Sequence, residues 1–163
     1  MSYLQRALSM DEFEGYYQVK SEPSAVNWSG FASAPDYHSL RSHFNVLIND
    51  PDVYLFFLRD AETHRLMGYA QLTRENDSSV QYSGFSLLRE FQNSGMSRRL
   101  CTLVLEKVIE LGAQKITGWI SEKNFVSVRL LQAFGMQPTG ETKVVRLPAL
   151  QREDVYHQYE KLL

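Results

Sequence analysis

Cysteine is scarce in this sequence, with a single copy, Cys101, among 163 residues. One cysteine excludes an internal disulfide and any metal site built from paired cysteines. The four histidines include no pair spaced four residues apart, which would place two ligands on one helical face. We therefore expect no bound metal. Cys101 lies among leucine and valine residues and is predicted to be a core residue rather than a nucleophile.

An excess of charge of either sign is also absent, because 17 basic and 19 acidic residues give a formal net charge of -2 at pH 7. Such a balance does not favour nucleic acid or an anionic membrane as a partner. No window approaches the roughly 20 apolar residues that a membrane span needs. The first residues lack the basic start and apolar run of a secretory signal. These absences lead us to expect a cytoplasmic protein.

The length suits one domain with its own core, which we expect to cover residues 1–163. Apolar spacing predicts helices over residues 10–19, 37–48, 96–111 and 125–134. Alternating or continuous apolar runs predict strands over residues 3–8, 53–60, 65–73, 80–88, 115–120, 142–147 and 155–162. The segment Lys20–Pro35 is turn-rich. The expected fold is a mixed α/β arrangement, with a central sheet of about seven strands flanked by about four helices.

Two connections in this pattern set the topology. The runs at 53–60 and 65–73 are joined by a short turn and predict an antiparallel hairpin. Residues 80–120 read as strand, helix, strand, which predicts two parallel neighbouring strands. Gly84 falls inside the first of these strands, where a glycine commonly marks a bulge or a close backbone approach. A hairpin sheet is therefore expected to continue into a parallel pair.

The turn "QNSGMS" (Gln92 to Ser97) lies where the strand of this unit passes into its helix. Successive backbone N–H groups and a helix N-terminus converge at such a point, which suits a phosphate. The helix opens with Arg98 and Arg99, which oppose the helix dipole unless an anion is bound there. Solvated surface arginines are the simpler interpretation. The turn fits neither the dinucleotide-binding nor the Walker spacing.

Two motifs resemble the signatures of the GNAT (Gcn5-related N-acetyltransferase) superfamily. Gln92 to Ser97 occupies the family's [QR]-x-x-G-x-[GA] turn, and Gly84 precedes Gly95 by eleven residues as in many members. The second signature, N-x-x-[SA]-x-x-L-Y-x-x-x-G-[FM], is matched by Asn124, Ser127, Leu130, Gly135 and Met136. The resemblance extends over most of the chain in element order.

The resemblance implies that acetyl-CoA, or another acyl-CoA, is the co-substrate. Its pyrophosphate would lie on the amides of Asn93 to Ser97, and its pantetheine arm on the preceding strand. Asn124 would hold the pantetheine or thiol end, and it is equally well placed to cap the following helix. The residues implied in cofactor binding are Ser86, Leu87, Leu88, Gln92, Asn93, Ser94, Gly95, Met96, Ser97, Arg98 and Asn124.

Two residues depart from the family pattern. Ser97 stands in the cofactor-binding turn where glycine or alanine is usual. Leu131 stands where many members carry a tyrosine that protonates the departing thiolate. Transfer to an amine needs a neutral nucleophile, a polarised thioester carbonyl and a proton path. A strand amide near Leu87 could polarise the carbonyl. For deprotonation we select Tyr82 and Glu122, with two further candidates in Glu75 and Asp77.

The acceptor site is expected in the first half of the chain, where Trp28 and Phe31 could form the wall of a cleft. Both aromatics could instead fill space beneath a long loop. The predicted function is transfer of an acetyl group to a small-molecule amine or amino sugar, by direct attack in a ternary complex. A non-catalytic CoA-binding or regulatory domain, and an interaction module without cofactor, stay open. A homodimer through exposed strand edges is possible.

Overall fold

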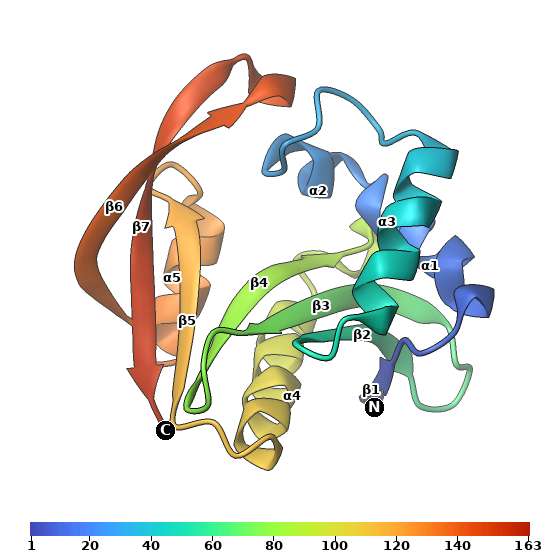
Figure 1. The fold of residues 1–163 in the computed structure, drawn as a ribbon, viewed down its shortest axis with the longest axis horizontal. Coiled ribbons are helices and arrows are strands. Elements are labelled where there is room, and N and C mark those ends of the chain that lie inside the picture. The colour runs from blue at the N-terminus through green and yellow to red at the C-terminus, as the bar shows by residue number, and fades with distance from the viewer.

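All 163 residues are described by the computed structural model, in which one mixed sheet runs through the molecule (Figure 1). Its strand order is β1-β2-β3-β4-β5-β7-β6. The strands are β1 (Ser2–Arg6), β2 (Val53–Asp60), β3 (Leu66–Arg74), β4 (Ser79–Leu87), β5 (Lys115–Ser121), β6 (Gln137–Leu147) and β7 (Arg152–Leu162). The predicted seven-stranded mixed α/β fold is confirmed.

Five α-helices and three short 3-10 helices connect these strands. They are η1 (Met10–Glu12), α1 (Phe13–Lys20), α2 (Pro23–Asn27), α3 (Tyr37–Asn49), η2 (Arg89–Phe91), α4 (Met96–Glu110), α5 (Phe125–Ala133) and η3 (Pro148–Leu150). The helix absent from the prediction is α2, which lies in the segment interpreted as turn-rich. Pro23 occupies its first turn, a favourable position for proline, but five residues are too few to show a helical period.

The strands of the predicted parallel pair separate soon after they begin. β4 and β5 pair only from Ser79 to Gln81 and from Lys115 to Thr117. Beyond that point β4 continues along β3, and β5 continues along β7. The two strands diverge toward their carboxyl ends (Figure 1). Their facing edges are therefore left without strand partners over the last residues of each strand.

A β-bulge interrupts β4 beside Gly84. The register with β3 pairs Gln71 with Gly84 and then Leu72 with Tyr82, so that Ser83 is the additional residue. A Cβ at Gly84 would lie 2.9 Å from the hydroxyl oxygen of Tyr69. The bulge expected of a glycine within this strand is present, and the close neighbour of Gly84 is a side chain rather than the backbone.

Two hydrophobic cores form on the opposite faces of the sheet. One holds the buried side of α4, including Leu100 and Val104, and receives Tyr82 from β4. The other holds residues of α1 and α3, including Phe44, and receives Tyr69 from β3. Figure 1 shows α4 and α5 behind the sheet and α3 in front of it. The open end of the β4–β5 pair thus lies between two helical layers.

The first helix differs from the prediction at its start. Ser9 Oγ accepts a hydrogen bond from the backbone N–H of Asp11, at 3.2 Å, rather than from Glu12. Glu12 Oε2 is buried without a partner, so Ser9 and Glu12 do not form the reciprocal hydrogen bonds of a capping box. The chain makes the 3-10 turn η1 before α1 begins at Phe13.

The outer strands of the sheet are β1 and β6. β6 is longer than predicted and contains Pro138, which an edge strand tolerates because one side of its backbone needs no partner. The predicted homodimer through strand edges stays a prediction. No helix is long and apolar enough to cross a membrane.

Candidate active site

The turn before α4 has an unusual backbone. Asn93 and Gly95 have φ angles of 58° and 82°, in the left-handed region. Gly95 is the N-cap of α4, and no side chain accepts a hydrogen bond from the first turn. An N-terminus without a side-chain cap presents its N–H groups to whatever lies beyond it.

The backbone N–H groups from Asn93 to Arg98 donate to no backbone or side-chain acceptor of the protein. The first bonded amide after them is that of Arg99, which donates to the carbonyl of Gly95 at 3.2 Å. These consecutive free donors stand at the positive end of the α4 dipole. Such an array is a binding site for an anion such as a diphosphate.

Side chains fix this turn from both ends. Gln92 Nε2 donates to the carbonyl oxygen of Leu87 at 2.9 Å and to Ser24 Oγ at 3.1 Å. Ser94 Oγ donates to the carbonyl of Phe91. Arg99 donates to the carbonyl of Ser2 at 3.2 Å, so it joins α4 to β1 and is neither an anion ligand nor a solvated arginine.

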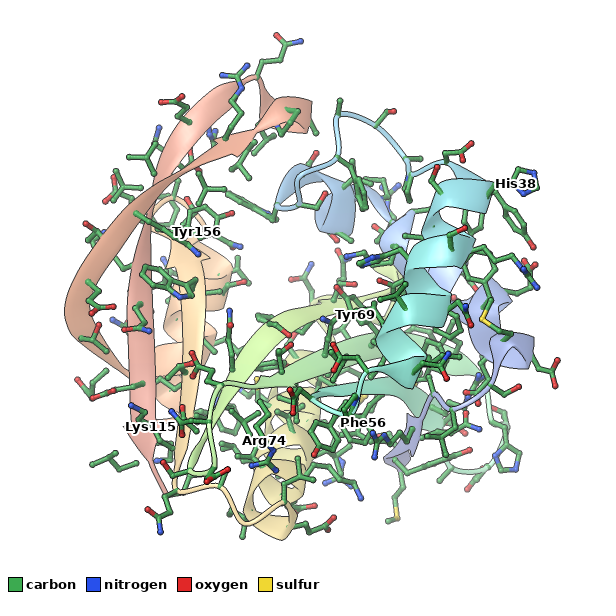
Figure 2. All side chains as sticks on the ribbon, in the orientation of Figure 1. His38, Phe56, Tyr69, Arg74, Lys115 and Tyr156 are labelled. Carbon is green, nitrogen blue, oxygen red and sulfur yellow. The ribbon has the colours of Figure 1, made fainter.

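A cleft of about 650 Å³ occupies the space where β4 and β5 diverge. Tyr69 and Tyr156 lie on its opposite sides (Figure 2). Its lining comes from all the neighbouring elements: Lys20, Ser24, Ala25, Trp28, Ser29, Tyr69, Tyr82, Ser83, Gly84, Phe85, Ser86, Leu87, Gln92, Asn93, Ser97, Leu100, Trp119, Ile120, Ser121, Lys123, Asn124, Phe125, Val126, Ser127 and Tyr156.

The end of β4 directs a backbone donor into this cleft. The N–H of Leu88 donates to the carbonyl of Met67 on β3 at 2.8 Å. Successive N–H groups of an extended chain point to opposite edges, so the N–H of Leu87 points away from β3. That edge of β4 has no strand partner at Leu87. A free amide donor therefore faces the opening between the strands.

A run of anion-binding amides beside an opened parallel strand pair is the arrangement that the sequence resemblance led us to expect. The model of the Acetyltransferase (GNAT) family matches residues 10–136. The chain belongs to the GNAT acetyltransferase family. Membership confirms the resemblance and the prediction that the chain is an N-acetyltransferase.

Known proteins similar to this GNAT chain include uncharacterized N-acetyltransferases of Mycobacterium bovis and Mycobacterium tuberculosis. They are 28% identical over 132 residues, which cover 81% of this chain and 83% of theirs. A spermidine N-acetyltransferase from Vibrio cholerae, solved in complex with CoA and spermine, matches 99% of this chain and 95% of its own at 19% identity, with a TM-score of 0.82. A putative acetyltransferase from Acinetobacter baylyi covers 100% of this chain and 93% of its own at 14% identity, with a TM-score of 0.78. The two structural likenesses establish the fold.

The residues selected for cofactor binding fall into two groups in this GNAT structure. Those that line the cleft are Ser86, Leu87, Gln92, Asn93, Ser97 and Asn124. Those that do not line it are Leu88, Ser94, Gly95, Met96 and Arg98. Among the second group, Leu88 is buried in the core shared with α1 and α3. The others border the site through the free amides of the turn, and Arg98 is exposed there.

Asn124 is placed for both of the roles considered for it, capping α5 and contacting a ligand in the cleft. Its side chain accepts a hydrogen bond from the backbone N–H of Ser127 at 3.4 Å, which caps α5. It also lines the cleft. The capping bond fixes the direction of the side chain, so structural and binding roles are compatible here.

Tyr82 lines the cleft from β4, on the face of the sheet that carries α4. Its hydroxyl is buried beside the thiol of Cys101 on α4 and makes no hydrogen bond with a nitrogen or oxygen atom. Burial raises the pKa of Tyr82 well above 10. The phenol therefore stays protonated at neutral pH, which disfavours the role of base predicted from the sequence and leaves a hydroxyl that keeps its proton to donate.

Glu122 is not brought to the cleft. Its carboxylate pairs with His157 Nε2 at 3.0 Å and is about half exposed. Its neighbours Ser121 and Lys123 do line the cleft. Glu122 belongs to the turn that follows β5, and its carboxylate is directed toward His157 on β7 rather than into the cleft. The structure gives no support to a catalytic role for it.

Glu75 and Asp77 also lie outside the cleft lining. Glu75 Oε1 accepts hydrogen bonds from Ser79 on β4, at 2.8 Å, and from Thr117 on β5, at 2.7 Å. These bonds hold together the paired ends of the two strands, opposite to the end where the strands diverge. Glu75 therefore contributes to the geometry of the site without facing it.

The two aromatics chosen for the acceptor wall have different positions. Trp28 lines the cleft, and its carbonyl accepts a hydrogen bond from the Tyr156 hydroxyl at 3.5 Å. Phe31 packs on the core beneath α1 and α3 and does not line the cleft. Of the two roles considered for this pair, Trp28 forms part of the cleft wall and Phe31 fills space in the core.

Several lining residues were missed in the sequence. Lys20, Tyr69, Trp119 and Tyr156 come from α1, β3, β5 and β7 and meet only through the sheet topology. No local motif signals them. Cys101, by contrast, is a buried core residue as predicted, and burial raises the pKa of its thiol to about 12.

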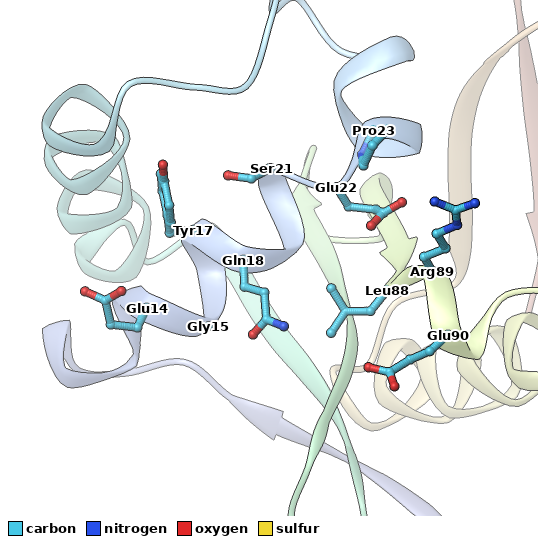
Figure 3. Close-up of a pocket in the computed structure, with 10 residues that line it drawn as sticks. All are labelled: Glu14, Gly15, Tyr17, Gln18, Ser21, Glu22, Pro23, Leu88, Arg89 and Glu90. Carbon is cyan, nitrogen blue, oxygen red and sulfur yellow. The ribbon is translucent and has the colours of Figure 1, made fainter.

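A second, more open depression lies between α1, the start of α2 and η2 (Figure 3). Figure 3 shows Glu14, Glu22, Arg89 and Glu90 around it. Glu90 is paired with Arg65, and Glu14 accepts a hydrogen bond from Tyr37. This depression shares no residue with the cleft, and the free amides of the α4 turn do not border it.

Proposed function

We propose that the chain transfers the acetyl group of acetyl-CoA to the amine of a small molecule or amino sugar, by direct attack of that amine in a ternary complex. The observation that carries the proposal is the run of free amides from Asn93 to Arg98 beside the cleft between β4 and β5. Diphosphate oxygens are the acceptors that such an array fits.

The comparisons support both substrates of this reaction. The relatives that match most of the chain are named N-acetyltransferases. The Vibrio cholerae neighbour is in complex with CoA and with spermine, a small-molecule amine. The alternative of a non-catalytic CoA-binding domain gains no support from either.

Acetyl-CoA supplies an acetyl group that is activated as a thioester. The free N–H of Leu87 is the donor that we assign to the thioester oxygen, where negative charge develops as the amine attacks. A C–N bond forms and the C–S bond breaks. The amine nitrogen loses one proton, and the sulfur gains one.

Tyr82 is the proton donor that we assign to the departing sulfur. Its hydroxyl lies beside the Cys101 thiol, makes no hydrogen bond with a nitrogen or oxygen atom, and belongs to a side chain that lines the cleft. Leu131 is buried in the same core and offers no hydroxyl from α5. No aspartate or glutamate lines the cleft, so we assign the proton lost by the amine to water.

The test is release of free CoA thiol from acetyl-CoA with a panel of small amines, with the acetylated amine identified by mass spectrometry. We expect amine-dependent turnover, and a rise in melting temperature with CoA because CoA binds the folded chain. Binding without turnover on any amine would support the non-catalytic alternative. The absence of any CoA-induced shift would contradict the site.

A further inference from the structure

The charge of the cleft is one-sided. The charged residues that line it are Lys20 and Lys123, and no aspartate or glutamate does so. Hydroxyl-bearing residues supply much of the remaining polar lining, among them Ser24, Ser29, Ser83, Ser97, Ser127, Tyr69 and Tyr156. Such a surface offers donors to an anionic or hydroxyl-rich ligand and no carboxylate to a cation.

Lys20 is a half-buried ammonium group with few partners. Its Nζ donates to the hydroxyl of Tyr69 at 3.3 Å and lies over the rings of Phe31 and Tyr69. No carboxylate lies within 4.0 Å of it. An ammonium group has three N–H donors, so two are left without an acceptor in the protein.

The other charges near the cleft do not neutralise Lys20. Lys123 lies 4.0 Å from Asp154, and Arg152 pairs with the same carboxylate at 2.7 Å. These three groups form their own cluster on the β7 side. On the α3 side, burial and then the charge of Lys20 lower the pKa of His43, so this imidazole is neutral at pH 7. Lys20 is thus an uncompensated cation.

Lys20 also lies on the opposite side of the sheet from the α4 turn. Tyr69, which binds it, is paired with Ser86 on β4, and directly paired residues share one face. That face carries α1 and α3. Ser86 Oγ is buried there without a hydrogen-bond partner. The face is therefore the acceptor side, separate from the amides assigned to the diphosphate.

We propose that the acceptor of this transferase carries, besides its amine, a carboxylate or phosphate group that binds Lys20. The proposal rests on the acetyl transfer proposed above and specifies its acceptor. A nearby cation also favours the neutral form of the attacking amine, which is the reactive form. A polyamine would bring only positive charge into a cleft that has no carboxylate.

The experiment compares matched amines with the purified full chain at saturating acetyl-CoA. Glucosamine 6-phosphate is set against glucosamine, and phenylalanine against phenylalanine amide, with spermidine as the polycation. A hydrogen-bonded charge pair predicts a kcat/KM that is roughly tenfold or more higher for the anionic member of a pair. The two pairs distinguish a phosphate from a carboxylate. Spermidine is expected to be the slowest substrate.

The variant Lys20→Met keeps the aliphatic stem and removes the charge. We expect it to reduce the preference for the anionic member to near one, while the KM for acetyl-CoA is unchanged. Lys107→Met, on the exposed side of α4 and away from the cleft, is the matched control and should retain the full preference.

Each failure has a distinct meaning. Equal or better turnover of the uncharged member in both pairs, or faster turnover of spermidine than of both anionic amines, overturns the anionic acceptor and leaves the acetyl transfer intact. A Lys20→Met effect confined to the KM for acetyl-CoA overturns the assignment of Lys20 to the acceptor. Binding of acetyl-CoA without acetylation of any anionic amine overturns the proposal of an anionic acceptor. Failure to bind acetyl-CoA overturns the proposed function itself.

Discussion

The residue that carries the proposed proton transfer is Tyr82, whose phenol is buried, protonated and beside the thiol of Cys101. Tyr82→Phe removes only that hydroxyl. We expect kcat to fall by about 10- to 100-fold, within or just below the range usual for general acids. Stability should change little, because the hydroxyl loses only a weak contact with the Cys101 thiol and no hydrogen bond with a nitrogen or oxygen atom. Steady-state kinetics and thermal unfolding of the same preparation measure both.

Tyr16→Phe is the matched control for this change. Tyr16 is equally buried but lies in the core on the other face of the sheet and does not line the cleft. Its kcat should match that of the unchanged chain. If Tyr82→Phe also retained full kcat, the sulfur would take its proton from another source and the assignment of Tyr82 would be wrong.

At this scale the sequence is informative where one short segment builds the site. The turn from Gln92 to Ser97 and the capping residue Asn124 were identified because their neighbours in sequence are also their neighbours in space. Glu122 and Phe31 were selected by residue type, and the direction of a side chain cannot be read from type alone. Lys20 could not be found, since its partner Tyr69 is 49 residues away.

The element that carries the proposed function is the turn into α4. Gly95 has a φ of 82°, and a Cβ placed there would meet nothing within 4 Å. Gly95→Ala therefore acts through backbone strain alone, which costs about 1 kcal/mol. Because the strain is relieved by moving the amides of the turn, we expect weaker binding of CoA, by several-fold or more. Calorimetric titration with CoA measures the loss.

Gly112, at the other end of α4, gives an unusually close control. Its φ is 75°, and a Cβ would again meet nothing within 4 Å. Gly112→Ala should lower the free energy of unfolding by a similar amount and leave CoA binding unchanged. Equal effects of the two substitutions on CoA binding would show that the turn before α4 has no special role.

The elements were predictable to different degrees. The long helices α3 and α4 show a helical spacing of apolar residues, and the strands β2 and β3 show continuous apolar runs, so each can be recognised in the sequence. α2 does not, because it is short and is fixed by contacts with η3 and β4 that lie far along the chain. The separation of β4 from β5 follows from the resemblance to a known family, since no residue in either strand specifies it locally.

At the scale of the whole molecule, Asp154 links β7 to the end of β5 in the C-terminal half of the chain. It is buried, pairs with Arg152 and accepts a hydrogen bond from Ser121 Oγ, at 2.6 Å, on β5. The hydrogen bond from Arg152 lowers the pKa of Asp154 below 3.8. The ionised Asp154 carboxylate therefore stabilises the folded protein, and this contribution is complete at pH values above the pKa that Asp154 has in the unfolded chain. It is lost as the pH falls through the lower pKa that Asp154 has in the folded protein.

Asp154→Asn should therefore destabilise the protein in a pH-dependent way. Arg152 is partly exposed, so we expect a loss smaller than that for a fully buried pair, about 1 to 3 kcal/mol at pH 7. The difference from the unchanged chain should shrink below pH 3.8. Urea unfolding at several pH values measures it, with Glu153→Gln, an exposed neighbour, as control. A difference independent of pH would contradict the role of the charge.

The most direct measurement is the response of individual backbone amides to CoA. In amide-resolved NMR of the full chain, titration with CoA should shift the signals of Asn93 to Arg98 and slow their hydrogen exchange, because these N–H groups have no acceptor in the protein alone. Amides in β1 and β2, which are already paired, should change little. Binding of CoA that leaves the signals from Asn93 to Arg98 unchanged would contradict the site described here.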